Sequence, residues 1–249
     1  MNDYLFTLAS ISFLRKLKKN NDRDWFEAHR AEYEALIKEP CRAFIDQIKR
    51  PLLKLFPDLK IDYRSISRIN RDTRFLPNKD PYKTWVAFLF RDLRLPKEES
   101  PALYLGFDPS GLAFGCGYYE FPKPVRDYFR TQISEKPSDR LFTRSLAKPT
   151  RAGYEPLGKL LKRLPPGFDP AHPNAEFLPR NGLYLSQEMN MPKEFYGPKF
   201  PEYALKKLAP CAEFFDWMRK MGKGAPSHPS RFLGAPVRSE RLSLMDEPG

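Results

Sequence analysis

The stretch that decides the fold is A-L-Y-L-G-F-D-P-S-G-L-A-F-G-C-G-Y, residues 102–118. Two apolar and aromatic runs, at 102–107 and 112–118, flank the tetrapeptide D-P-S-G at 108–111. Aspartate first, proline second and glycine fourth is the pattern of a type I turn, so the segment predicts a β-hairpin. A third apolar run at 84–90 predicts a further strand before it, and residues 63–69 look extended. We therefore expect an antiparallel meander.

Upstream of the meander, the first 57 residues predict helices. Phe13, Leu14 and Leu17 share one helical face, and the run N-N-D at 20–22 is typical of one helix ending and the next being capped. A third helix is expected from Pro40, with its apolar stripe at Phe44, Ile45, Ile48, Leu52 and Leu55.

Downstream of the meander, proline at 122 or 124 predicts the start of another helix, residues 183–187 predict a strand, and residues 202–221 predict a last amphipathic helix. The fold class predicted is α+β: N-terminal helices packed on an antiparallel sheet, with further helices C-terminal to it. We expect one domain over residues 1–222 and a flexible C-terminal tail over residues 223–249, which is rich in glycine, proline and serine.

Composition points to a basic, soluble, cytoplasmic protein. The 249 residues carry a net charge of +12, which favours anionic partners without specifying them. The three cysteines, at 41, 116 and 211, are widely spaced and form no C-x-x-C, which argues against a disulfide framework or a zinc site. The apolar run at 5–14 has its basic residues after it rather than before it, which is the wrong polarity for export, and we expect no membrane association.

Chemical character is concentrated in R-I-N-R-D-T-R-F-L-P-N-K-D-P-Y-K, residues 68–83. Arginine offers a planar fork that matches two phosphate or carboxylate oxygens, and lysine adds a mobile charge. Asp72 would orient these arginines, hold a metal or act as a catalytic base. The candidate anion-binding residues are Arg68, Arg71, Arg74, Lys79, Tyr82 and Lys83.

Three readings of this segment remain open. The first is a phosphate pocket, in a protein that would act on a phosphorylated small molecule or nucleotide. The second is a non-catalytic nucleic-acid-binding module, because basic and aromatic residues interleave at Tyr63–Arg64 and Arg74–Phe75. The third is a structural or interaction domain in which aspartates tie the arginines into an internal lattice.

Two further features bear on function. His172, in a polar loop bounded by prolines, is a second candidate catalytic residue as acid or base, and the alternative is that its ring caps the local turn. Gly111, Gly115 and Gly117 are not a phosphate loop, because no G-K-[ST] follows them. Glycines within a strand more often mark a bulge or a close backbone approach.

Two blocks of sequence resemble a known family. They are F-L-R-K-L-K-K-N-N-D-R-D-W-F-E-A-H-R at 13–30 and the pattern R-x-x-R-D-x-R-F followed by Asn, Lys and Tyr. Together they resemble the mostly bacterial domain of unknown function 2461, over about residues 6 to 218. Weaker matches are the hairpin glycines and residues 161–173. The resemblance implies one compact domain and brings no established activity. The matching residues of the second block are Arg68, Arg71, Asp72, Arg74, Phe75, Asn78, Lys79 and Tyr82.

Overall fold

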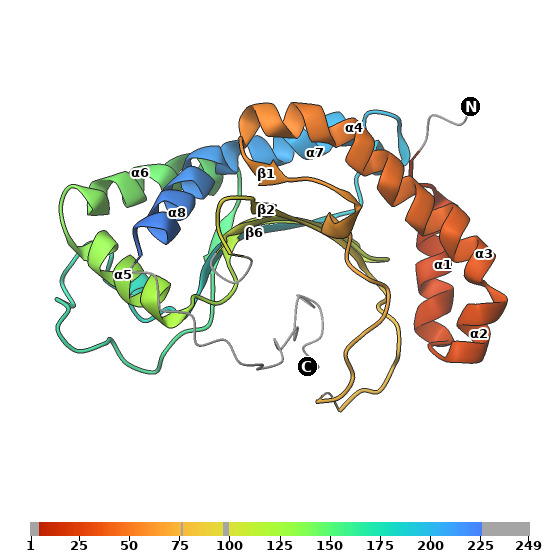
Figure 1. Ribbon diagram of the computed structural model, residues 1–249, viewed down its shortest axis with the longest axis horizontal. Coiled ribbons are helices and arrows are strands. Elements are labelled where there is room, and N and C mark those ends of the chain that lie inside the picture. Colours follow the sequence, from red (N-terminus) through yellow and green to blue (C-terminus); the bar gives the residue numbers. More distant parts are fainter. Residues whose placement is uncertain (1–4, 76, 97–99, 226–249) are drawn as a thin grey trace.

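A six-stranded antiparallel sheet forms the centre of the protein, as a computed structural model that describes residues 5–75, 77–96 and 100–225 shows (Figure 1). The strand order is β1-β2-β3-β4-β6-β5, and every neighbouring pair is antiparallel. The strands are β1 Leu59–Lys60, β2 Val86–Asp92, β3 Ala102–Phe107, β4 Gly111–Tyr118, β5 Glu155–Leu157 and β6 Leu183–Asn190.

The predicted hairpin is confirmed. Strands β3 and β4 pair from Ala102 opposite Gly117 to Phe107 opposite Leu112. The Asp108 carboxylate closes the turn by accepting the backbone N–H of Ser110 at 2.6 Å.

The N-terminal helices are also as predicted. They are α1 Leu8–Lys19, α2 Arg23–Ala28, α3 Arg30–Tyr33, the π-helical turn η1 Glu34–Lys38 and α4 Glu39–Leu55. Asp22 is the N-cap of α2, where its Oδ1 accepts the backbone N–H of Trp25 at 2.8 Å. Residues 63–69, predicted to be extended, begin instead with the short 3-10 helix η2 Tyr63–Ser65.

The C-terminal half holds more helix than the sequence predicted. Helix α5 Lys123–Ser134 begins where expected, but α6 Ser138–Arg151 was not predicted. The single helix expected at 202–221 is two, α7 Phe200–Leu208 and α8 Ala212–Gly224, separated by the 3-10 turn η6 Ala209–Cys211. Pro210 lies in that turn, and a proline cannot donate to a continuous helical ladder. The remaining short helices are η4 Ala175–Phe177 and η5 Lys193–Tyr196.

Helix α8 continues to Gly224, two residues into the segment predicted to be a C-terminal tail. The rest of that predicted segment, residues 226–249, lies outside the described residues. In the described ranges, no helix combines the length and apolar character needed to cross a membrane.

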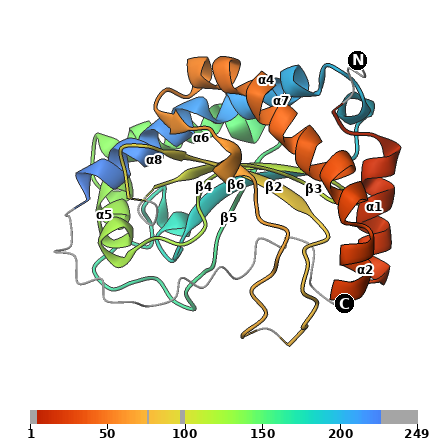
Figure 2. The same cartoon turned by 45° about the vertical axis from the view of Figure 1, so that its right-hand side comes forward.

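Helices α4, α6, α7 and α8 cover one face of the sheet (Figures 1 and 2). Alternate strand residues point into this layer and are fully buried, for example Phe88, Leu105, Phe114 and Leu185. The rings of Phe44 on α4 and Phe88 on β2 lie 4.8 Å apart. The buried hydrophobic cluster includes residues from both ends of the described chain. The opposite face, here called the helix-free face, has no helix of the described residues lying across it (Figures 1 and 2).

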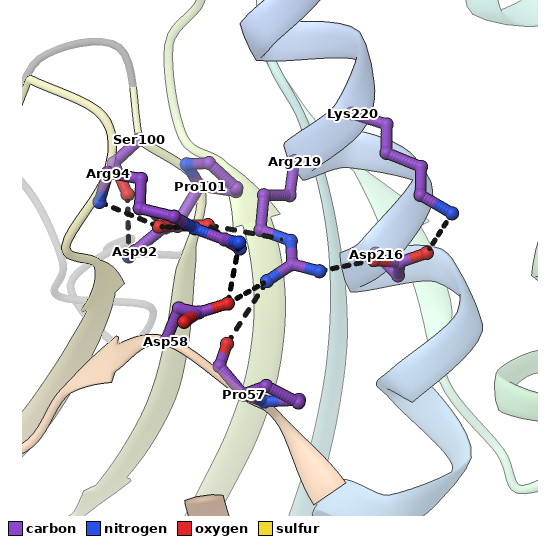
Figure 3. Close-up of polar contacts among 9 residues, drawn as sticks. All are labelled: Pro57, Asp58, Asp92, Arg94, Ser100, Pro101, Asp216, Arg219 and Lys220. Carbon is purple, nitrogen blue, oxygen red and sulfur yellow. Dashed lines mark hydrogen bonds and ion pairs between the residues drawn. The ribbon is translucent and has the colours of Figure 1, made fainter.

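A polar clamp fastens α8 to the end of β2 (Figure 3). The carboxylate of Asp92 is completely buried and accepts two hydrogen bonds from the Arg94 guanidinium, at 3.1 and 3.0 Å. Arg219 of α8 places its Nε 3.4 Å from Asp92 and donates to the carbonyl of Pro57 at 3.0 Å. Asp58 lies between the two arginines, 2.6 Å from Arg94 and 3.4 Å from Arg219. The clamp therefore joins three parts of the chain that are distant in sequence.

The strand glycines do mark a close backbone approach, as their positions suggested. A Cβ on Gly117, whose φ is +129°, would lie 2.4 Å from the carbonyl oxygen of Leu183 on β6. A Cβ on Gly111 would lie 2.1 Å from the carbonyl oxygen of Met189. Strands β4 and β6 can therefore come this close only where β4 has no side chain.

Candidate anion-binding site

The cation-rich segment forms a β-ribbon that projects beyond the sheet (Figures 1 and 2). Its two sides are joined by isolated bridges, Ile66 to Phe88 and Asn70 to Tyr82. The backbone N–H of Lys83 donates to Ile69 at 2.7 Å, and that of Arg71 donates to Pro81 at 2.8 Å. We call residues 66–83 the arm.

Helix α2 and the residue before its cap fasten the arm to the rest of the protein. Asn21 donates from Nδ2 to the carbonyl of Tyr82 at 2.9 Å and accepts the Tyr82 backbone N–H at 3.0 Å. The Tyr82 side chain is 5% exposed and stacks on Phe26 with 4.1 Å between ring centroids. Tyr82 therefore belongs to the hydrophobic core and anchors the arm.

At the arm tip, which we define as Asp72, Arg74 and Lys79, the charged side chains are bonded to other groups of the arm itself. Arg74 makes a two-point contact with Asp72, at 2.9 and 2.6 Å, and Lys79 donates to the carbonyl of Thr73 at 2.9 Å. Hydrogen bonds from the Arg74 side chain and backbone lower the pKa of Asp72 to about 2. A carboxylate with so low a pKa is a weak proton acceptor at neutral pH, so its evident role is to orient Arg74.

Three cations gather at the arm base, which we define as Arg68, Arg71 and Lys83. Burial, reinforced by the charges of Arg68 and Arg71, lowers the pKa of Lys83. Arg71 has one distant counter-ion, Asp80, at 3.9 Å. Arg68 makes no hydrogen bond or ion pair with any residue that the structure describes. The arm base therefore has one ion pair among the described residues, from Arg71 to Asp80, and the charge of Arg68 also helps to lower the pKa of Asp72.

His172 lies in a different part of the molecule from the arm. Its Nδ1 accepts the backbone N–H of Asn174 at 3.0 Å, and its Nε2 lies 3.8 Å from Asp139 of α6. The ring therefore caps the local turn, as one of the two readings of the sequence held. Figure 1 shows the arm and the segment between β5 and β6 that carries His172 near opposite ends of the sheet. The two candidate catalytic residues are not brought together.

The helix-free face carries polar groups that sequence reasoning did not identify. Tyr104 of β3, Gly115 of β4 and Ser186 of β6 form one row across the sheet, and Gly106, Ala113 and Glu188 form the next. The Tyr104 hydroxyl lies over Gly106, where a Cβ would be 2.2 Å from it. Neither the side-chain oxygens of Tyr104 and Glu188 nor the Ser186 hydroxyl have a hydrogen-bond partner among the described residues.

The charged groups that act on Tyr104 and Glu188 are carboxylates, whereas those at the arm base are cations. Burial raises the pKa of Tyr104, and the nearby charges of Asp108 and Glu188 add to the effect. Burial also raises the pKa of Glu188, with contributions from Asp108 and Glu155. Side chains alternate between the two faces of the sheet along β3 and β6. Once the pairing register is known, this alternation places Tyr104 and Glu188 on the same face. Among the described residues, no group of three or more His, Cys, Asp or Glu side chains is arranged to hold a metal ion.

An α+β scaffold that carries a cationic arm, with one sheet face that no described helix covers, is the class of protein that the fold defines. The chain belongs to the family described as a conserved hypothetical protein (DUF2461), which it matches over residues 9–217. No curated protein and no solved structure matches the chain.

Proposed function

We propose that this protein binds a phosphorylated small molecule or nucleotide through the arm base. The observation that carries the proposal is the gathering of Arg68, Arg71 and Lys83, which have a single ion pair, 3.9 Å long, among the described residues. Two guanidinium forks and an ammonium group offer a phosphate more donors than it has oxygens. An anion bound there would relieve the mutual repulsion that the cations otherwise bear.

The tip and the base of the arm have different roles in this proposal. At the tip, Arg74 pairs with Asp72 and Lys79 donates to the carbonyl of Thr73, and these contacts hold the ribbon in shape. The base cations contact the ligand. Tyr82 supports them from the core, and His172 and Asp72 have no catalytic role in the proposed site.

In this proposal the rest of such a ligand lies toward the helix-free face. Strand β2 begins at Val86, three residues after Lys83, and its next residue, Ala87, lies opposite Gly106 of β3. The four residues from Lys83 to Ala87 span at most about 14 Å, which is within the reach of a ligand of nucleotide size. The unpartnered side chains of Tyr104 and Glu188 would then meet its hydroxyl or ring groups.

The test compares ligand binding by wild type, Arg71→Ala and Arg74→Ala, with inorganic phosphate, nucleotides, sugar phosphates and single-stranded RNA as probes. A ligand at a hundredfold excess over its Kd stabilises the folded state by about 2.7 kcal/mol, a rise in Tm of about 5–10 °C. We expect one phosphorylated probe to give this rise in wild type and in Arg74→Ala, and not in Arg71→Ala.

Arg74 is the matched control because it lies in the same arm and carries the same charge but is already paired with Asp72. Equal loss in the two variants, or no response of wild type to any probe, would overturn the proposal. A response to RNA alone that moderate salt abolishes would instead favour a nucleic-acid-binding module. Circular dichroism of each variant checks that the fold is retained.

A further inference from the structure

A second candidate site lies on the helix-free face, where β4 carries only small residues. Ala113 and Gly115 are two of its positions on this face, and neither has a side chain longer than a methyl group. Strands β3 and β6 pair with β4 on either side, so their backbones lie about 10 Å apart across it. The side chains of Tyr104 on β3 and of Ser186 and Glu188 on β6 therefore flank a strip of sheet that β4 leaves uncovered.

Ser186 is a buried polar residue whose hydroxyl has no hydrogen-bond partner. The residue is 6% exposed, and its hydroxyl is bonded to no group that the structure describes. Unlike the enclosed Oε1 of the neighbouring Gln187, the Ser186 oxygen keeps accessible surface, so a ligand on this face can reach it. A buried hydroxyl without a partner is costly, which indicates that a further group completes the site.

Tyr104 and Glu188 supply two further oxygens that lack a hydrogen-bond partner among the described residues. The Tyr104 side chain lies over Gly106, because a Cβ on that glycine would be 2.2 Å from the hydroxyl oxygen and 2.7 Å from Cζ. Gly106, Ala113 and Glu188 form one row across the sheet. The hydroxyl and the carboxylate therefore stand at the two ends of this row, with the methyl group of Ala113 between them. Ser186 lies in the adjacent row, two residues before Glu188.

The charge around these oxygens is negative. Burial raises the pKa of Glu188, and the charges of Asp108 and Glu155 raise it further. Asp108 and Glu188 likewise add to the effect of burial on Tyr104, whose pKa is also raised. A positive group bound beside Glu188 would relieve this repulsion, whereas an anion would increase it. The site therefore favours a ligand of the opposite charge to one that the arm base would bind.

An aromatic pair lies beside the three oxygens. Tyr184 is two residues before Ser186 on β6 and so points to the same face, and its ring centroid lies 5.7 Å from that of Tyr119. Tyr119 is 47% exposed, which leaves aromatic surface for a ligand to contact. Because the charge of Arg180 acts on Tyr184, the cationic end of a ligand belongs at Glu188 and its apolar body at the two tyrosines.

We propose that the helix-free face binds a primary amine with an aromatic or apolar body. An ammonium group has three N–H donors and no acceptor, which matches the three oxygens of Tyr104, Ser186 and Glu188. An alcohol could donate one hydrogen bond there but would leave the carboxylate without a counter-ion. The site adjoins that of the proposed function, whose ligand extends toward the same face, but it needs no phosphate at the arm base.

The experiment titrates the full chain with phenethylamine and 2-phenylethanol, which share a carbon skeleton and differ in carrying an ammonium or a hydroxyl group. Binding is followed by NMR on the backbone amides of β4 and β6. We expect phenethylamine to bind about tenfold more tightly or better, since a hydrogen bond between charged groups has that value. Equal affinities of wild type for the two compounds, or the absence of a saturable shift, would overturn the proposal.

Two variants locate the ammonium group. Glu188→Gln keeps the size of the side chain and removes its charge, so it should weaken binding of phenethylamine about tenfold or more. The control Glu202→Gln, on α7 across the sheet, should leave binding unchanged. Ser186→Ala should weaken binding about threefold to tenfold without destabilising the fold, because the hydroxyl that it removes has no partner. Wild-type affinity in both site variants, or the same loss in Glu202→Gln, would contradict the assignment.

Arg71→Ala separates this inference from the proposed function. This variant should bind phenethylamine as wild type does, while it loses the response to a phosphorylated probe. Loss of phenethylamine binding in Arg71→Ala would overturn the placement of the amine at Tyr104, Ser186 and Glu188. Circular dichroism of each variant checks that the fold is retained in these comparisons.

Discussion

Removing the Arg219 side chain tests the polar clamp between α8 and β2. In Arg219→Met the buried carboxylate of Asp92 keeps Arg94 but loses its second cation, and the carbonyl of Pro57 loses a charged donor at 3.0 Å. A hydrogen bond from a charged group contributes about 1.5–3 kcal/mol. The ion pairs to Asp58 and Asp216, which are 43% and 38% exposed, add at most about 1 kcal/mol each.

We therefore expect Arg219→Met to lower the free energy of unfolding by about 3 kcal/mol, with a fall in Tm of about 6–12 °C. Urea denaturation followed by circular dichroism measures it. The control is Lys220→Met, which removes the neighbouring cation of the same helix; Lys220 is 74% exposed and pairs with Asp216 alone among the described residues. That change should cost less than about 1 kcal/mol. If the two variants lose the same stability, the clamp does not stabilise the fold as argued.

The clamp also predicts a dependence on pH. Burial alone would raise the pKa of Asp92, but the hydrogen bonds and charge of Arg94 and the charge of Arg219 outweigh it and lower the pKa. A carboxyl whose pKa is lower in the folded state stabilises the fold above its unfolded pKa, near 3.8, and this contribution is lost as the pH falls through the folded pKa. The stability difference between wild type and Arg219→Met should therefore shrink in acid.

Three other perturbations have defined outcomes. Lys83, whose pKa is lowered, should titrate below the other lysines in NMR of the reductively methylated protein, and bound phosphate should raise its pKa; a titration no different from that of an exposed lysine would contradict the desolvated arm base. Gly117→Ala should lower the free energy of unfolding by about 2–5 kcal/mol, because the new Cβ meets backbone at 2.4 Å and φ is positive. The control Gly167→Ala, with positive φ but nothing within 4 Å, should cost about 1–2 kcal/mol in the same urea titration, and equal losses would refute the close-approach argument. Asn21→Ala removes both hydrogen bonds to the Tyr82 backbone and should cost about 2 kcal/mol; an unchanged hydrogen-exchange rate of the Tyr82 amide would show that the arm is held otherwise.

Much of the fold follows from local pattern. The turn at Asp108 and the cap at Asp22 are set by side chains that bond their own neighbouring backbone, so both could be predicted from a few residues. Helix α6 could not, because it has few apolar positions and carries Pro149 within it. The break between α7 and α8 follows from Pro210, which lies inside an otherwise amphipathic run and cannot donate to a continuous helical ladder.

The sequence located the candidate site but did not show which of its cations are paired. Composition identified the cations of residues 68–83, yet it could not separate Arg74, which Asp72 neutralises, from Arg71, which faces Asp80 at 3.9 Å. That distinction depends on the pairing of the ribbon. Tyr104 of β3 and Glu188 of β6 are 84 positions apart in the sequence (188 − 104), and only the strand order and register bring them to one face.

The clamp also has a consequence for synthesis of the chain. The contact from Arg219 to Pro57 spans 162 residues. At about 5–20 residues per second, translation needs roughly 8–30 s to supply the arginine after the proline has been made. Until then the carboxylate of Asp92 can pair with Arg94 but not with Arg219, so we expect the end of β2 to stay loosely packed. Helix α8 would then act as a timing element that delays final consolidation of the sheet until all of the matched family region, residues 9–217, has been synthesised.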